Sequence, residues 1–196
     1  MSNHSGTAVL IAAFITGLFC APCQAAETVF GGSYAKDCQN AAEHAAYGHG
    51  TDDNGIFACN LAIGIQTLTR RDLAGTYVNR GILALAGRRI DAALGDFDAA
   101  IAMLPDLGGA YANRGAALVA QGEWAAGIAE IDRGLALGGP EPEKSYFNRG
   151  LARERLGDVK GAYFDYLQAE RLKPGWDDPA RELARFKVTT RQDVSG

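Results

Sequence analysis

The sequence predicts an all-α protein, a solenoid of antiparallel helix pairs, from three observations. A phrase of the form Tyr-x-Asn-Arg-Gly begins at Tyr77, Tyr111 and Tyr146, with spacings of 34 and 35 residues. Each copy is followed at matched distances by small and large apolar residues and then by a proline. Apolar residues within each copy recur with helical periodicity. A repeat period in the thirties is typical of arrays that stack one helical unit several times.

The first repeat, residues 74–107, is expected to form a helix–turn–helix unit. Its first helix carries Tyr77 and Gly81 on one stripe and Val78 and Ile82 on a second, so it is apolar on two sides. A helix with two buried sides must contact both its own partner and another element. In an array, that other element is the next repeat.

Two further copies, residues 108–142 and 143–176, repeat this pattern. Gly122 and Gly157 mark the turns between their helices. Pro140 comes one place late relative to the other closing prolines, which accounts for the extra residue of the second copy. The sequence therefore predicts three units of one design.

These units resemble tetratricopeptide repeats over residues 74–176. The resemblance rests on small, aromatic and proline positions, which in the first copy are Tyr77, Gly81, Ala93, Phe97, Ala100 and Pro105. It implies a right-handed superhelix in which the first helix of each pair lines a concave groove. In members of the family this groove commonly holds a peptide or another protein. The resemblance therefore implies a non-enzymatic scaffold that binds a protein or peptide and needs no cofactor.

One regularity departs from that family. Each repeat has an arginine where the family usually has an apolar residue, and a carboxylate follows 16 residues later: Arg80 with Asp96, Arg114 with Glu130, and Arg149 with Asp165. We expect structural ion pairs between the two helices of each unit, because every arginine comes with its own carboxylate. Breaking such a partly buried pair is costly. The alternative is a ladder of ligand-binding arginines.

The groove should be lined by three equivalent asparagines and by neighbouring side chains. An asparagine amide offers both a donor and an acceptor, which suits the backbone of an extended peptide. The alternative is that the asparagines cap or bridge neighbouring helices. The predicted lining is Asn79, Asn113 and Asn148 with Val78, Ile82, Leu85, Ala112, Ala116, Val119, Phe147, Leu151 and Lys144.

The two ends of the array are expected to differ from the repeats. Residues 26–73 predict a divergent helical hairpin, with helices at 35–46 and 56–67 and an extended or disordered segment at 27–34. Residues 177–196 predict a C-terminal capping helix and a tail, because a terminal repeat exposes an apolar face. The cap should begin with Asp177 as N-cap and bury Leu183, Phe186 and Val188.

Residues 1–25 predict a secretory signal peptide. They contain no Asp, Glu, Lys or Arg, they are nearly all apolar from Ala8 to Cys20, and they end in small residues that favour cleavage after Ala25. A retained anchor is the alternative, although the apolar run is short for a membrane-spanning helix. We therefore expect a periplasmic or secreted protein with no membrane span after cleavage.

Cleavage there would leave two cysteines, Cys38 and Cys59. In an oxidising compartment the simplest expectation is that they form a disulfide, and two buried free thiols are the alternative. The loop between them is 21 residues long, which corresponds to about 3 kcal/mol of stabilisation in the chain-entropy model.

Composition argues against several other classes of function. The net charge is −4, from 19 basic and 23 acidic residues without a basic face, so a nucleic-acid partner is not expected. His44, His49, Asp52 and Asp53 lie close together in sequence but match no known metal-ligand spacing. Two hypotheses remain. One is a binding scaffold of the cell envelope, and the other is a structural subunit or homo-oligomer whose groove is filled by another chain.

Overall fold

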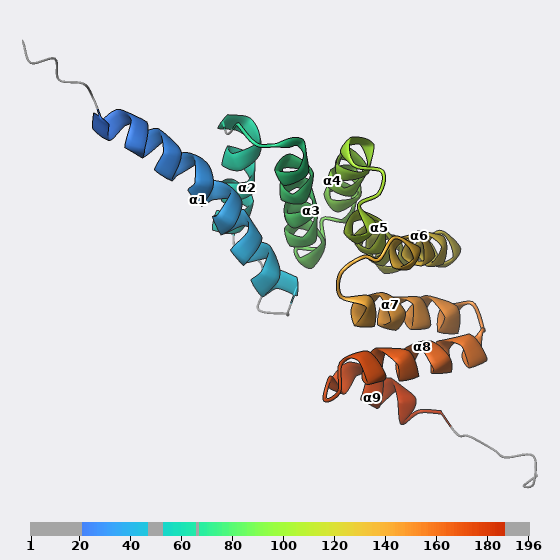
Figure 1. Cartoon of the computed structure of the whole chain (residues 1–196). Coiled ribbons are helices and arrows are strands. Elements are labelled where there is room, and N and C mark those ends of the chain that lie inside the picture. Colours follow the sequence, from blue (N-terminus) through green and yellow to red (C-terminus); the bar gives the residue numbers. More distant parts are fainter. Residues whose placement is uncertain (1–20, 47–52, 66, 187–196) are drawn as a thin grey trace, which may run out of the picture.

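The computed structural model describes residues 21–46, 53–65 and 67–186, with side chains described from residue 34 onward. This part of the chain is all-helical, which confirms the predicted fold class (Figure 1). Its helices are α1 (Ala21–Ala46), α2 (Asp53–Ile65), α3 (Arg70–Ala86), α4 (Ile90–Met103), α5 (Gly108–Gln121), α6 (Trp124–Ala136), α7 (Pro142–Arg155), α8 (Val159–Leu172) and α9 (Asp177–Leu183). Within these ranges, no helix is both long enough and apolar enough to cross a bilayer.

Consecutive helices form antiparallel pairs that stack in one row, from α1 and α2 at one end to α7 and α8 at the other, with α9 packed on the last pair (Figure 1). The three predicted repeats contain the pairs α3 with α4, α5 with α6, and α7 with α8. Each pair also packs on the pair before it, as expected for a solenoid.

Local sequence signals set the helix ends. The Thr69 hydroxyl accepts a hydrogen bond of 3.1 Å from the Asp72 amide and caps α3, and the Asp158 carboxylate caps α8 through the Gly161 amide at 2.9 Å. Gly122 and Gly157 follow α5 and α7 with φ of 95° and 82°. Only glycine adopts this backbone conformation readily, so both turns occur at the predicted glycines.

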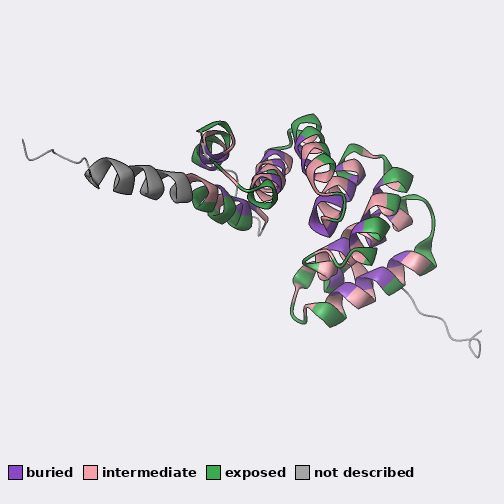
Figure 2. Ribbon diagram, turned by 45° about the horizontal axis from the view of Figure 1, so that its top comes forward, coloured by how far each residue is buried: buried purple, intermediate pink, exposed green. Residues whose placement is uncertain are grey.

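Buried residues line the helix faces that meet within each pair (Figure 2). The glycine of the repeated phrase makes room for a large side chain from the second helix. A Cβ placed on Gly81 would lie 2.5 Å from the Phe97 ring, and one on Gly150 would lie 2.7 Å from the Tyr166 ring. In the middle pair Ile131 replaces the ring, so α5 and α6 pack more closely.

The N-terminal hairpin differs from the prediction in its extent. Residues 27–34, expected to be extended or disordered, belong to α1, which begins at Ala21. Once a helix is nucleated, each added residue gains one backbone hydrogen bond, and the segment contains no proline, so the helix continues through it despite Gly31 and Gly32. The expected cleavage point after Ala25 falls within α1, and residues 1–20 lie outside the described part of the chain.

The C-terminal cap is present as α9, but it starts differently. Trp176, not Asp177, is the N-cap residue, because its backbone is extended and Asp177 is already helical. The Trp176 ring lies 5.0 Å from that of Phe147, and the Phe186 ring lies 5.6 Å from that of Tyr163. These contacts cover the last pair, while Val188 and the predicted tail lie outside the described residues.

Candidate functional site

A groove with a volume of about 590 Å³ runs along the first helices of successive pairs. Its size is typical of ligand and peptide sites. Its lining comes from four stretches of chain: Gln39, Ala42, Glu43 and Ala46 of α1; Gly75, Val78, Asn79 and Ile82 of α3; Leu107, Gly109, Ala110 and Asn113 at the start of α5; and Pro140 and Glu141 before α7.

Four of the predicted groove residues belong to this lining: Val78, Asn79, Ile82 and Asn113. The other predicted residues lie outside it, namely Leu85, Ala112, Ala116, Val119, Lys144, Phe147, Asn148 and Leu151. Phe147 instead packs toward the C-terminal cap, with its ring 5.7 Å from that of Tyr166. Positions that are equivalent in sequence diverge in space, because each pair is rotated relative to the one before it.

The wall formed by α1 is the part of the groove that sequence reasoning missed. Gln39, Ala42, Glu43 and Ala46 lie at positions i, i+3, i+4 and i+7, which share one face of a helix. This spacing could have identified the face. The sequence predicts residues 35–46 as the first helix of a divergent hairpin. Because the hairpin lacks the repeated phrase, however, no register identified which of these residues line the groove.

The three asparagines do not bridge neighbouring helices. The Asn113 amide nitrogen donates to the Gly109 carbonyl one turn earlier in the same helix, at 2.9 Å. Among the described residues, the Asn79 and Asn148 side chains have no hydrogen-bond partner. Asn79 therefore keeps both its donor and its acceptor available in the groove, and Asn113 keeps its oxygen as an acceptor.

Two carboxylates are the ionisable groups of the described lining, Glu43 and Glu141. Glu43 accepts a hydrogen bond of 2.9 Å from the Gln39 amide. Glu141 pairs with Lys144 at 2.6 Å, and the Lys144 ammonium also donates to the Ala46 carbonyl at 3.4 Å. Lys144 thus connects the start of α7 to the end of α1 at the rim of the groove.

The structure brings each predicted arginine together with its predicted carboxylate. Each guanidinium donates twice, at 2.9 and 2.6 Å from Arg80 to Asp96, at 3.2 and 2.5 Å from Arg114 to Glu130, and at 2.9 and 2.6 Å from Arg149 to Asp165. Each also lies over the tyrosine three residues earlier, at 5.1 to 5.4 Å from the ring centroid. The pairs join the two helices of one unit.

A third contact of each arginine reaches the preceding pair of helices. The remaining nitrogen donates from Arg80 to Asn60 at 2.8 Å, from Arg114 to Asp98 at 2.7 Å, and from Arg149 to Asp132 at 2.5 Å. These partners precede their arginines by 20, 16 and 17 residues, so no fixed spacing identifies them in the sequence. The arginines therefore connect successive units as well as the helices within each unit.

The local electrostatics keep these arginines charged. The pKa of Arg80 is raised above its ordinary value chiefly by its hydrogen bond to Asp96. Burial acts to lower the pKa of Arg149, but hydrogen bonds to Asp165 and Asp132 outweigh it and raise the pKa. Every guanidinium nitrogen of these three arginines already donates a hydrogen bond to a carboxylate or amide oxygen. This arrangement favours a structural role over a ligand-binding ladder.

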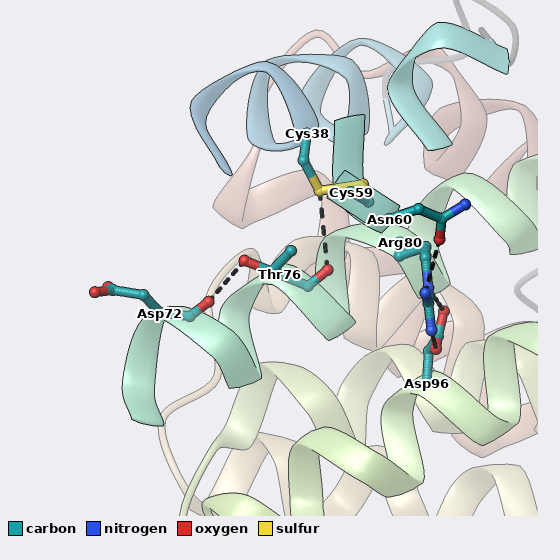
Figure 3. Close-up of a disulfide and its surroundings, with 7 residues drawn as sticks. All are labelled: Cys38, Cys59, Asn60, Asp72, Thr76, Arg80 and Asp96. Carbon is teal, nitrogen blue, oxygen red and sulfur yellow. Dashed lines mark hydrogen bonds and ion pairs between the residues drawn. A yellow bond between two sulfur atoms is a disulfide. The ribbon is translucent and has the colours of Figure 1, made fainter. Parts of the chain in front are cut away.

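A charge reversal at the first of these arginines is expected to be rescued by its partner. Arg80→Glu removes the partner of the nearly buried Asp96 and places a like charge against it, so it should destabilise the protein by about 3–5 kcal/mol. Adding Asp96→Arg should recover part of this loss, as measured by urea unfolding. Arg80 is the cleanest site because its third partner, Asn60, is neutral (Figure 3). A double variant no more stable than Arg80→Glu would contradict the pairing.

The Cys38–Cys59 disulfide joins α1 to α2, as the sequence predicts (Figure 3). Both cysteines are fully buried and pack with Leu83 of α3 and with small residues of the first hairpin. The Cys38 sulfur lies 3.9 Å from the carbonyl oxygen of Thr76. Cys38 lies one helical turn before Ala42, which belongs both to the groove lining and to the buried cluster around the disulfide, so the disulfide anchors the helix that forms this wall.

The histidine cluster considered from the sequence gives no metal site in the described part of the chain. His44 and Asp53 are described, whereas His49 and Asp52 lie outside the described residues. Where side chains are described, no group of three or more His, Cys, Asp or Glu residues is placed to hold a metal ion.

Comparison with solved structures defines the class of fold. The Arabidopsis OM64 TPR domain is 22% identical, covers 60% of this chain and 96% of its own length, and superposes with a TM-score of 0.56. A crystal structure of MamA is 20% identical, with coverage of 67% and 74% and a TM-score of 0.54. A double mutant of MamA from RS-1 is 17% identical, with coverage of 78% and 83% and a TM-score of 0.57. The chain therefore has the tetratricopeptide-repeat fold. No protein-family model matches it, and neither does any curated protein.

Proposed function

We propose that this chain is a non-enzymatic scaffold that binds an extended segment of a partner polypeptide in the groove between α1, α3 and α5. The observation that carries this proposal is the Asn79 amide. It lies in the lining, and its side chain has no hydrogen-bond partner among the described residues. The amide is open to water in the free protein, so a ligand hydrogen bond that replaces this water contributes a net gain of about 0.5–1.5 kcal/mol.

The groove offers the two kinds of contact that an extended peptide needs. Asn79 and Asn113 can hydrogen-bond to backbone amide and carbonyl groups, which every peptide presents. Val78 and Ile82 provide an apolar surface beside them for a partner side chain. Most of the lining is preformed by packed helices, which lowers the entropic cost of binding.

The cell envelope is the compartment that we propose. A buried disulfide forms and persists in oxidising compartments and is rare in the cytosol. The apolar leader expected at residues 1–25 supports the same location. Cleavage after Ala25 can be tested directly by sequencing the N-terminus of the protein isolated from the envelope.

Filling the groove should abolish binding without harming the fold. Gly75 lines the groove, and a Cβ placed on it meets no atom within 4 Å. Gly75→Leu should reduce affinity at least tenfold, because its side chain occupies the space of the ligand. It should also stabilise α3, since glycine in a helix costs about 0.5–1 kcal/mol relative to alanine. The ligands to use are peptides selected from a random library on the purified protein, with affinity measured by calorimetry.

Gly64→Leu is the matched control. Gly64 has equally open surroundings, but it lies on α2, outside the lining. A second comparison sets the double variant Asn79→Ala/Asn113→Ala against the single variant Asn148→Ala. Asn148 is the equivalent asparagine outside the groove. Equal affinity for Gly75→Leu and Gly64→Leu would overturn the proposal. The alternative occupant of the groove is a second copy of the chain, and light scattering of the free protein tests for it. A stable oligomer that Gly75→Leu dissociates would mean that a second copy fills the groove.

A further inference from the structure

We infer that the Cys38–Cys59 disulfide controls the groove, so that peptide binding requires the oxidised protein. This inference rests on the proposed function, because it assigns a regulation to the same groove. It starts from the position of α1, whose described C-terminal half forms one complete wall of the groove. A loss of α1 from the array would therefore remove a wall of the binding site.

Among the described side chains, those that α1 itself contributes to its packing are small. From α1, the buried cluster contains Cys38, Ala42 and Ala45, and the large side chains packed with them are Leu83 and Ile82 of α3 and Ile56 of α2. Alanine faces bury little apolar area, so they contribute little to docking a helix. At the C-terminal end of α1, the Ala46 carbonyl accepts a hydrogen bond of 3.4 Å from Lys144, which also pairs with Glu141.

The disulfide is a covalent link between α1 and α2 that adds to this packing. It closes a loop of 21 residues and keeps α1 beside α2 even when the helix separates from its neighbours. In the chain-entropy model, closing a loop of this length disfavours the disordered chain on the order of 100-fold, which is the upper bound for its effect on the docking of α1. Because α1 lies at the end of the described solenoid, it can detach without disturbing the units beyond α3.

Reduction by a dithiol would break this constraint in a balanced two-electron step. One thiolate of the dithiol attacks a sulfur of the Cys38–Cys59 bond, forming a mixed disulfide and releasing one cysteine. The second thiolate then attacks the mixed disulfide, releasing the other cysteine and leaving the dithiol as a disulfide. The two protons of the dithiol end on Cys38 and Cys59.

Ligand and reductant should oppose each other. Both sulfurs belong to residues with 0% exposure, so a reductant reaches them only when α1 moves away from its neighbours. A peptide seated against Gln39 and Glu43 stabilises the docked position of α1, so it should shift the redox equilibrium toward the disulfide and also slow its reduction. By linkage, the same coupling makes reduction weaken peptide binding.

The test compares oxidised protein, dithiothreitol-reduced protein and the Cys38→Ala/Cys59→Ala variant, which keeps small apolar side chains in the cluster. Hydrogen exchange should show α1 amides exchanging faster in the last two, by up to about 100-fold. Amides of α5–α8 should be unchanged, and peptide affinity should fall at least tenfold. Dithiothreitol should have no further effect on the variant.

The outcomes separate this inference from the proposed function. If peptides bind the oxidised protein, are blocked by Gly75→Leu and bind the reduced protein equally well, the redox inference is wrong and the proposed function stands. If no groove-dependent peptide binds at all, the proposed function fails. Unchanged α1 exchange would overturn the inference by itself. Loss of protection throughout α5–α8 would also overturn it, because the bond would then stabilise the whole array rather than α1.

Discussion

Replacing Asp165 with alanine is expected to destabilise the protein by about 3–5 kcal/mol, the cost of removing one partner from a buried ion pair. Its side chain is only 4% exposed and accepts hydrogen bonds from two arginines, Arg149 and Arg153. The substitution leaves both guanidinium groups without this partner inside the α7–α8 pair. Urea unfolding followed by circular dichroism measures the loss.

Asp132→Ala is the matched control for that substitution. Asp132 also pairs with Arg149, but its side chain is 48% exposed and it contacts a single guanidinium nitrogen. An exposed pair contributes about 0–1 kcal/mol, so we expect a small effect. An equal loss of unfolding free energy in the two variants would contradict this account, because it would show that burial of the Asp165 carboxylate does not strengthen its ion pairs.

Gly134→Ala is expected to destabilise the middle pair by about 1–3 kcal/mol, the typical cost of overpacking. A Cβ on Gly134 would lie 2.8 Å from the Ala112 nitrogen and 2.9 Å from the Gly108 oxygen. Both are backbone atoms of α5, so the two helices must move apart to admit a methyl group. Thermal unfolding by calorimetry provides the measurement.

Gly95→Ala is a control for which the expected change in stability has the opposite sign. Gly95 lies inside α4, and a Cβ there meets no atom within 4 Å. The substitution should stabilise the protein by about 0.5–1 kcal/mol through helix propensity alone. Destabilisation by Gly95→Ala, or a neutral Gly134→Ala, would mean that close approach of α5 and α6 is not what selects glycine.

The repeated phrase made the architecture predictable, because its tyrosine, arginine and glycine make the same kind of contact in every unit. Its glycine faces a large side chain of the second helix, and its arginine meets a carboxylate 16 residues later. Both relations are local to one helical pair. A fixed spacing in sequence therefore corresponds to a fixed contact in space.

The groove was only partly predictable, because it depends on how the pairs are arranged relative to one another. Asn79 and Asn113 line it, while Asn148 at the equivalent position does not. The α1 wall was missed because the first hairpin diverges from the phrase. The arginine contacts to Asp98 and Asp132 were missed for the same physical reason, since they join different units at varying spacings.

The most direct test of the account is a map of amide chemical-shift changes when a selected peptide is titrated into the oxidised protein. We expect the largest changes along 39–46, 75–82 and 107–113 and at Glu141, which together line the groove, and their loss in Gly75→Leu. Changes centred instead on α4, α6 and α8, the second helices of the pairs, would contradict the groove as the site of binding.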